Sequence, residues 1–135
     1  MTIHQFTNIL IVDDSSAMRG VLRKLLTQLG FRNFDEASDG SAALEKISTS
    51  HFGLVISDWN MEPMNGQLLL ERVRAKKEYA NLPFIMMTAD PTIDKIVQAK
   101  QAGVTCFISK PFRAEELQAK IVQANAILRI TSVVH

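Results

Sequence analysis

The sequence predicts an α/β fold in which helices cover both faces of a parallel β-sheet. Five short apolar segments alternate with five longer segments whose apolar residues recur at helical spacing. The short segments are almost continuously apolar, which is typical of strands buried on both faces of a parallel sheet. Right-handed β–α–β crossovers then restrict how the five units connect.

Four of the five predicted strands are apolar runs that end directly at polar or charged residues. Leu54, Val55 and Ile56, for example, continue through Ser57 into Asp58. Such a run is too short for an independent helix and fits a buried strand. Strands are expected at residues 8–13, 31–37, 54–58, 83–88 and 104–109.

Helical patterns occupy the intervals between these strands and the segment after the last one. Ser15 or Ser16 can cap the first helix by accepting backbone N–H bonds. Apolar residues recur at helical spacing within residues 18–29, 43–47, 68–73, 93–97 and 117–128. On the helix expected at residues 92–102, the side chains predicted to face the sheet are Ile93, Ile96 and Val97.

The expected helix ends rest on stop signals and on charge. Gly30 and Gly103 follow the first and fourth helices, as glycine commonly does at a helix C-terminus. The basic segment 72–77 is interpreted as the solvated end of the third helix, where cations suit the helix dipole. The last helix is expected at 113–128, followed by a short uncapped tail at 130–135.

The composition is that of an ordinary soluble domain. The 135 residues are 47% hydrophobic and 21% charged, so we expect one monomeric domain over 1–135 with no separate output domain. A net charge of +1 gives no electrostatic basis for binding nucleic acid or a membrane. Cys106 is the only cysteine, and no segment resembles a signal peptide or a membrane span. A cytoplasmic location is therefore expected.

The polar residues at the strand ends form a candidate site. Asp13 and Asp14 follow the first strand, Asp58 ends the third, Thr88 ends the fourth, and Lys110 follows the fifth. The carboxyl ends of parallel strands lie at one edge of a sheet, where ligands bind. These five side chains are therefore expected to converge.

The chemistry of this set favours a metal ion and a phosphoryl group. Asp13, Asp14 and Asp58 would repel one another at short distance unless a cation intervened. Oxygen ligands favour a hard divalent ion, and a few acids with room for water favour Mg²⁺. Lys110 adds a charge suited to phosphate, and Thr88 adds a hydroxyl donor. An aspartate in such surroundings is suited to accept a phosphoryl group, because positioning and charge neutralisation replace a dedicated base.

At these positions the sequence resembles the receiver domain of two-component response regulators. The stretches 11–19, 55–61, 87–89 and 110–112 are similar to stand-alone chemotaxis regulators of the CheY type, and the resemblance covers residues 6–128. It implies a flavodoxin-like (βα)5 fold with strand order 2-1-3-4-5. It also implies a signalling domain that catalyses only its own phosphorylation and dephosphorylation.

The resemblance implies a role for each residue of the acidic cluster. Asp58 would accept the phosphoryl group. Asp14 and Asp58 would ligate Mg²⁺ directly, together with the backbone carbonyl of Asn60, while Asp13 would act through water. The phosphoryl oxygens would be bound by Thr88 and Lys110.

The resemblance also implies how the signal is made and read. Thr88 and Phe107 would form a switch pair, Asn60 and Asp90 would tune hydrolysis, and the peptide bond before Pro111 would be cis. The phosphodonor would be a histidine kinase. The surface formed by the fourth helix, fifth strand and fifth helix would bind a protein target, either the flagellar motor switch or another signalling protein. Phe107 lacks the hydroxyl of the tyrosine that is common in chemotaxis members.

Three alternatives differ from this interpretation at identifiable residues. A haloacid-dehalogenase-like phosphotransferase would carry its nucleophile on the first strand, and the stretch Asp58-Trp59-Asn60 lacks that family's second acid. A flavodoxin-like electron carrier would need a hydroxyl- and glycine-rich loop where Asp13 and Asp14 stand. A receiver-like scaffold that is never phosphorylated is disfavoured by the complete set of acids.

Overall fold

A computed structural model describes residues 2–134, with side chains described for residues 2–127, and it confirms the α/β prediction. Five parallel strands form one sheet in the order β2-β1-β3-β4-β5. The strands are β1 (Asn8–Val12), β2 (Asn33–Ala37), β3 (Leu54–Asp58), β4 (Phe84–Thr88) and β5 (Cys106–Ser109). The helices are α1 (Ser16–Gln28), α2 (Gly40–Thr49), α3 (Gly66–Arg74), the short 3₁₀ helix η1 (Lys77–Tyr79), α4 (Ile93–Gln101) and α5 (Ala114–Val134).

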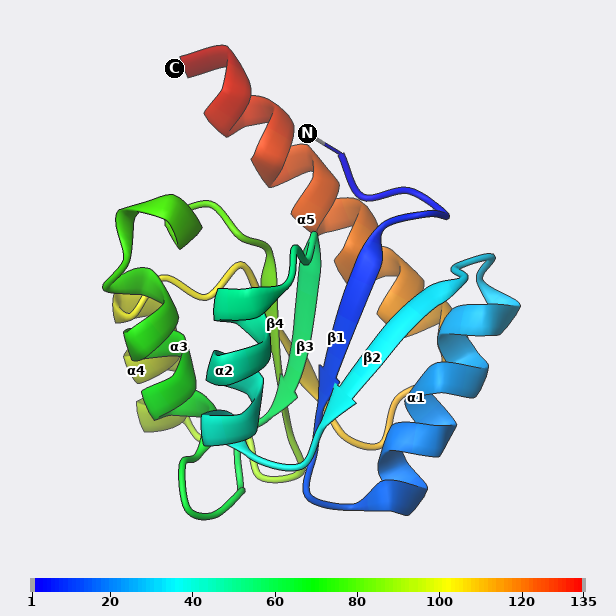
Figure 1. Cartoon of the computed structure of the whole chain (residues 1–135), viewed down its shortest axis with the longest axis vertical. Coiled ribbons are helices and arrows are strands. Elements are labelled where there is room, and N and C mark those ends of the chain that lie inside the picture. Colours follow the sequence, from blue (N-terminus) through cyan, green and yellow to red (C-terminus); the bar gives the residue numbers. More distant parts are fainter. Residues whose placement is uncertain (1, 135) are drawn as a thin grey trace.

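The helices cover both faces of the sheet (Figure 1). Along β1, Leu10 and Val12 pack with α2, α3 and α4 on one face, whereas Ile9 and Ile11 pack with α1 and α5 on the other. These four side chains have no exposed surface, which explains why the strand is continuously apolar. Burial on both faces holds the strands in register, so their carboxyl ends meet at one edge.

The prediction for the inward face of α4 was wrong for two of its three residues. Ile93 is 80% exposed and Val97 is 45% exposed, whereas Ala99 is fully buried. At 3.6 residues per turn, Val97 lies about 160° and Ile93 about 120° around the helix from Ala99. Ile96, about 60° away, is half-buried. The small Ala99 side chain therefore faces the sheet, and the branched residues lie on the outer surface.

Two predicted helix ends were also wrong. The last helix continues to Val134 instead of stopping at 128, because no glycine or proline interrupts residues 114–134. The third helix ends at Arg74, and Arg74 is only partly exposed, whereas the basic segment 72–77 suggested a solvated helix end. Its guanidinium donates to the backbone oxygens of Gly103 and Tyr79.

Among the described residues, no helix is both long and apolar enough to cross a bilayer.

A charged network fastens α1 to the edge strand β2. The Glu36 carboxylate accepts hydrogen bonds from Arg19 Nε at 2.9 Å and from the Arg23 guanidinium. The hydrogen bond from Arg23, followed by that from Arg19, outweighs partial burial and lowers the pKa of Glu36. A carboxylate with a lowered folded-state pKa stabilises the fold above its unfolded pKa, and this contribution disappears as the pH falls through the folded pKa.

Glu36→Gln is therefore expected to lower the free energy of unfolding at pH 7 by roughly 1 kcal/mol, since the pair is partly solvated. The difference from the wild type should shrink below about pH 4, where the carboxylate becomes protonated. Urea denaturation at several pH values measures both effects. Glu45→Gln, an exposed site on α2, is the matched control. An equal loss in both variants, or a loss independent of pH, would contradict this account.

Candidate functional site

Three carboxylates meet at the carboxyl edge of the sheet. Asp13 and Asp14 follow β1, and Asp58 is the last residue of the adjacent strand β3. Each offers an oxygen, and the three oxygens lie within 4.8 Å of one another. Asp13 and Asp58 are 1% and 7% exposed, whereas Asp14 is exposed. The strand ends thus create a concentrated negative charge that opens to solvent on one side.

Lys110 is the cation that reaches this cluster. Its Nζ lies 3.1 Å from Asp13 Oδ2 and 3.1 Å from Asp58 Oδ1. Its backbone N–H donates to the Thr88 carbonyl at 2.7 Å, which ties the loop after β5 to the end of β4. The peptide bond between Lys110 and Pro111 is cis.

Burial and charge act in opposite directions on this ion pair. Burial, with a smaller contribution from the charge of Asp13, raises the pKa of Asp58, while Lys110 opposes this rise. Burial is also the largest influence on Lys110 and by itself lowers its pKa. The hydrogen bonds and charges of Asp58 and Asp13 outweigh it and raise the pKa of Lys110. The ammonium is therefore held in its charged form between two acids.

Local hydrogen bonds fix the two loops that present the acids. Asp13 Oδ1 accepts from the Ser15 backbone N–H at 2.9 Å, and Ser15 in turn caps α1 by accepting from Met18. Arg19 Nη1 donates to the Asp13 carbonyl at 2.7 Å, a contact that the sequence pattern did not indicate. One turn of α1 thus holds Asp13 from its backbone and from its side chain.

The loop after Asp58 is held by backbone bonds on both sides. The Trp59 N–H donates to the Met87 carbonyl, and the Gly66 N–H donates to the Trp59 carbonyl, each at 2.9 Å. A side chain at Gly66 would collide with the Asp58 backbone carbonyl, so α3 begins in direct contact with the strand end. Asn60 lies exposed within this loop.

Thr88 and Asp90 lie at the end of the neighbouring strand β4. Thr88 is fully buried, and its Oγ1 accepts from the Asp90 backbone N–H at 3.1 Å. Asp90 is exposed and forms a 3.8 Å ion pair with Lys95 on α4. The Thr88 hydroxyl hydrogen has no acceptor among the described residues and can be donated to a ligand.

An aromatic pair beside the site was not foreseen from the sequence. The Trp59 and Phe107 rings meet edge to face with centroids 6.4 Å apart, and Trp59 is only 7% exposed. The Lys95 ammonium lies 5.7 Å from the centroid of the Trp59 ring, a cation–π geometry. The residue next to Asp58 is therefore in contact with β5 and with α4. Only the adjacency of residues 58 and 59 could have indicated this arrangement.

The donor set fits a magnesium ion. Three carboxyl groups face the one ammonium of Lys110, so acidic groups outnumber the cation at the cluster. All of the side-chain donors are oxygens, and exposed Asp14 leaves room for water molecules, which Mg²⁺ characteristically retains. The cluster is therefore suited to hold a hard divalent cation.

Comparisons with known proteins agree with this geometry. Residues 9–122 match the response regulator receiver domain family. The chain is 46% identical over 113 residues to the chemotaxis protein CheY of Pseudomonas aeruginosa, covering 84% of this chain and 91% of that protein. The identity to chemotaxis protein CheY-3 of Vibrio cholerae is also 46%, covering 84% and 87%. The solved structure of the response regulator CheY4 of Vibrio cholerae superposes with a TM-score of 0.81 at 31% identity, covering 88% and 98%.

The chain therefore belongs to the response regulator receiver domain family, and it is a CheY-like receiver of two-component signalling.

Proposed function

We propose that this protein accepts a phosphoryl group from a histidine kinase onto Asp58 and loses it by hydrolysis. The observation that carries the proposal is the ammonium of Lys110, 3.1 Å from both the Asp13 and the Asp58 carboxylates within a cluster of three acids. A buried aspartate beside a fixed cation is suited to hold the charge of a transferred phosphoryl group. Labelling with a small phosphodonor tests whether Asp58 accepts a phosphoryl group, and the decay of that label tests its hydrolysis.

The transfer step follows from the groups at the edge of the sheet. An oxygen of Asp58 attacks phosphorus, the bond to the donor nitrogen breaks, and its electrons return to the imidazole, which takes up a proton. Lys110 stabilises the charge on the phosphoryl oxygens, and the buried Thr88 hydroxyl can donate to one of them. A water molecule later attacks phosphorus, which releases inorganic phosphate and restores the Asp58 carboxylate.

We propose Asp14, Asp58 and the Asn60 carbonyl as direct Mg²⁺ ligands and Asp13 as a ligand through water. The exposure of Asp14 and the contacts of Asp13 with Ser15 and Lys110 support this division. When bound, Mg²⁺ would neutralise charge on the acids and on the phosphoryl group.

Asn60→Met is expected to lengthen the lifetime of the phosphorylated protein several-fold. Asn60 and Asp90 lie two positions after Asp58 and Thr88, both are exposed, and we propose that they border the path of the attacking water. A bulkier apolar side chain would hinder this water. The measurement is the first-order loss of label after the phosphodonor has been removed. Asn81→Met, at the opposite edge of the sheet, is the control. Equal decay rates in the wild type, Asn60→Met and Asn81→Met would mean that the attacking water does not pass Asn60.

The proposed output is a change of the α4–β5–α5 surface, read by a protein target such as the flagellar motor switch or another signalling protein. The named relatives are chemotaxis proteins, which supports this class of target. Exposed apolar residues on α4 and α5 are suited to a protein contact: Ile93, Val97 and Val122. We propose that Thr88 moves toward the phosphoryl group and that Phe107 then turns inward.

Phe107→Ala is expected to keep phosphorylation but to reduce the response of the single tryptophan to activation by at least half. Phe107 contacts the Trp59 ring, so a movement of Phe107 should change Trp59 fluorescence when Mg²⁺ and beryllofluoride are added. Phe107→Tyr preserves the ring and should preserve the response. An undiminished response in Phe107→Ala would remove this aromatic from the switch.

A further inference from the structure

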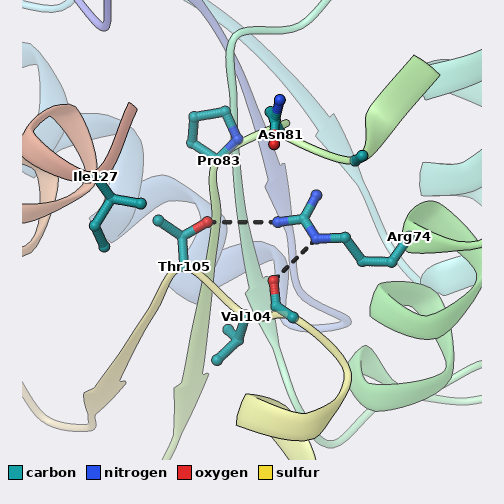
Figure 2. Close-up of a pocket in the computed structure, with 8 residues that line it drawn as sticks. Arg74, Asn81, Pro83, Val104, Thr105 and Ile127 are labelled. Carbon is teal, nitrogen blue, oxygen red and sulfur yellow. Dashed lines mark hydrogen bonds between the residues drawn. The ribbon is translucent and has the colours of Figure 1, made fainter. Parts of the chain in front are cut away.

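A polar cavity (Figure 2) lies before the amino ends of β4 and β5, whereas the acidic cluster lies at the carboxyl edge of the sheet. It has a volume of about 140 Å³ and opens to solvent near the amino ends of β4 and β5. Its lining residues come from α3, from the loops before β4 and β5, and from α5: Arg74, Ala80, Asn81, Pro83, Gly103, Val104, Thr105 and Ile127. None of them belongs to the proposed phosphorylation site.

Arg74 places a partly buried positive charge in the wall of this cavity. Its Nε, Nη1 and Nη2 donate to the Gly103 carbonyl, the Tyr79 carbonyl and Thr105 Oγ1 at 2.9, 2.7 and 3.4 Å. Three of the five guanidinium N–H groups are thus engaged, which leaves two available. These bonds fasten the end of α3 to the loop before β5.

No carboxylate among residues 2–127 forms an ion pair with Arg74. Carbonyl and hydroxyl oxygens satisfy its N–H groups but do not cancel its charge. Burial lowers the pKa of Arg74 to about 10, so the group remains protonated at neutral pH. A charge that is partly withdrawn from water without a counter-charge costs some stability, and an anion beside it would reduce that cost. The contacts that fasten α3 explain the position of Arg74 but not the open cavity beside its charge.

The other lining groups define what an anion would meet. Thr105 Oγ1 already accepts from Arg74 and from the Phe84 backbone N–H, so its own hydrogen can be donated to a ligand. Asn81 is exposed and lines the same cavity as Arg74 (Figure 2). Pro83 and Ile127 provide apolar surface on the remaining sides (Figure 2). An oxyanion with a short apolar body matches this combination.

We propose that this cavity binds a small organic carboxylate, with the carboxylate on Arg74 and Thr105 and its apolar part against Pro83 and Ile127. Its volume compares with that of protein cavities that hold a benzene molecule, which corresponds to roughly six non-hydrogen atoms. Isobutyrate has this size and is a suitable probe. Because the cavity faces away from the three acids, binding should need no metal ion.

The test is a titration of the protein with sodium isobutyrate in EDTA at constant ionic strength, followed by ¹H–¹⁵N NMR. Saturable shifts are expected at the amides of residues 81 and 103–105 and not at residues 13, 14 and 58. Acetate should bind more weakly because it buries less apolar surface. Absence of saturable shifts at residues 103–105, or equal affinities for acetate and isobutyrate, would overturn the proposal.

Asn81→Asp is the decisive variant, because it replaces an exposed amide with a carboxylate of the same shape in the cavity that Arg74 also lines. The tethered charge should weaken isobutyrate binding at least tenfold, equivalent to about 1.4 kcal/mol. Gln118→Glu makes the same charge change nine residues, or about 13 Å, before Ile127 on α5 and should leave binding unchanged. Unchanged affinity in Asn81→Asp would overturn the proposal. Arg74→Gln, if it folds, should abolish binding, and retained binding would also overturn it.

Discussion

Gly66→Ala is expected to destabilise the protein by roughly 3 kcal/mol, an effect typical of strained insertions into a packed site. A Cβ at this position would overlap the backbone carbonyl of Asp58 and lie 2.8 Å from Met86 Sδ. The methionine can move, but the carbonyl belongs to a central strand and cannot. The strain would therefore fall on the strand end that carries the proposed phosphoryl acceptor. Urea denaturation measures the loss as a shift of the midpoint.

Gly20→Ala is the matched control for this substitution. Gly20 lies within α1, and a Cβ there would meet no heavy atom within 4 Å. Alanine in a helix interior is favoured over glycine, so this variant should gain about 0.5–1 kcal/mol. Opposite signs for the two glycine-to-alanine changes are expected. A loss at Gly66 no larger than the change at Gly20 would mean that the loop before α3 relaxes freely.

Asp58→Asn is expected to abolish phosphoryl labelling by acetyl phosphate, a loss beyond a hundredfold in the initial rate. The amide keeps the shape of the carboxylate but removes the nucleophilic oxygen and its charge. Asp13 and Asp14 remain in this variant, but Asp13 is buried and bonded to Ser15 and Lys110. The measurement is the label incorporated per minute in the presence of Mg²⁺.

Asp94→Asn, an exposed acid on α4, is the control for this substitution and should label at the wild-type rate. Comparable labelling of Asp58→Asn and Asp94→Asn would show that another group accepts the phosphoryl group.

The sequence predicted the sheet and the acidic cluster because both follow from chain-local patterns. Each strand is a short apolar run that is buried in the sheet. The polar residue that ends or follows the run therefore lies at the carboxyl edge of the sheet. Asp13, Asp58 and Thr88 could therefore be assigned to one edge without knowledge of any side-chain contact. The strand order β2-β1-β3-β4-β5 came from the resemblance to receiver domains, and the structure confirmed it.

The surfaces of the helices could not be predicted in the same way. On α4 the apolar residues Ile93, Ile96 and Val97 suggest an inward face, but the fully buried residue of this helix is the small Ala99. A helical pattern gives relative angles around the helix and not the direction of the partner. Which side of α4 is buried depends on contacts between elements that are distant in sequence.

Arg74 and Trp59 show the same limit for polar and aromatic side chains. Arg74 appeared as one member of a solvated basic segment, yet it bonds to carbonyls at Tyr79 and Gly103. No pattern in the sequence indicates that Trp59 packs against Phe107, which lies 48 positions later in the sequence. Such long-range contacts leave no local signal.

Phosphorylation of Asp58 is tested by the mass of the protein after incubation with acetyl phosphate and Mg²⁺, followed by mapping of the modified peptide. We expect a gain of one phosphoryl group, located on the peptide that contains Asp58, and no gain when EDTA replaces Mg²⁺. A phosphoryl group on any other residue, or equal labelling in EDTA, would contradict it.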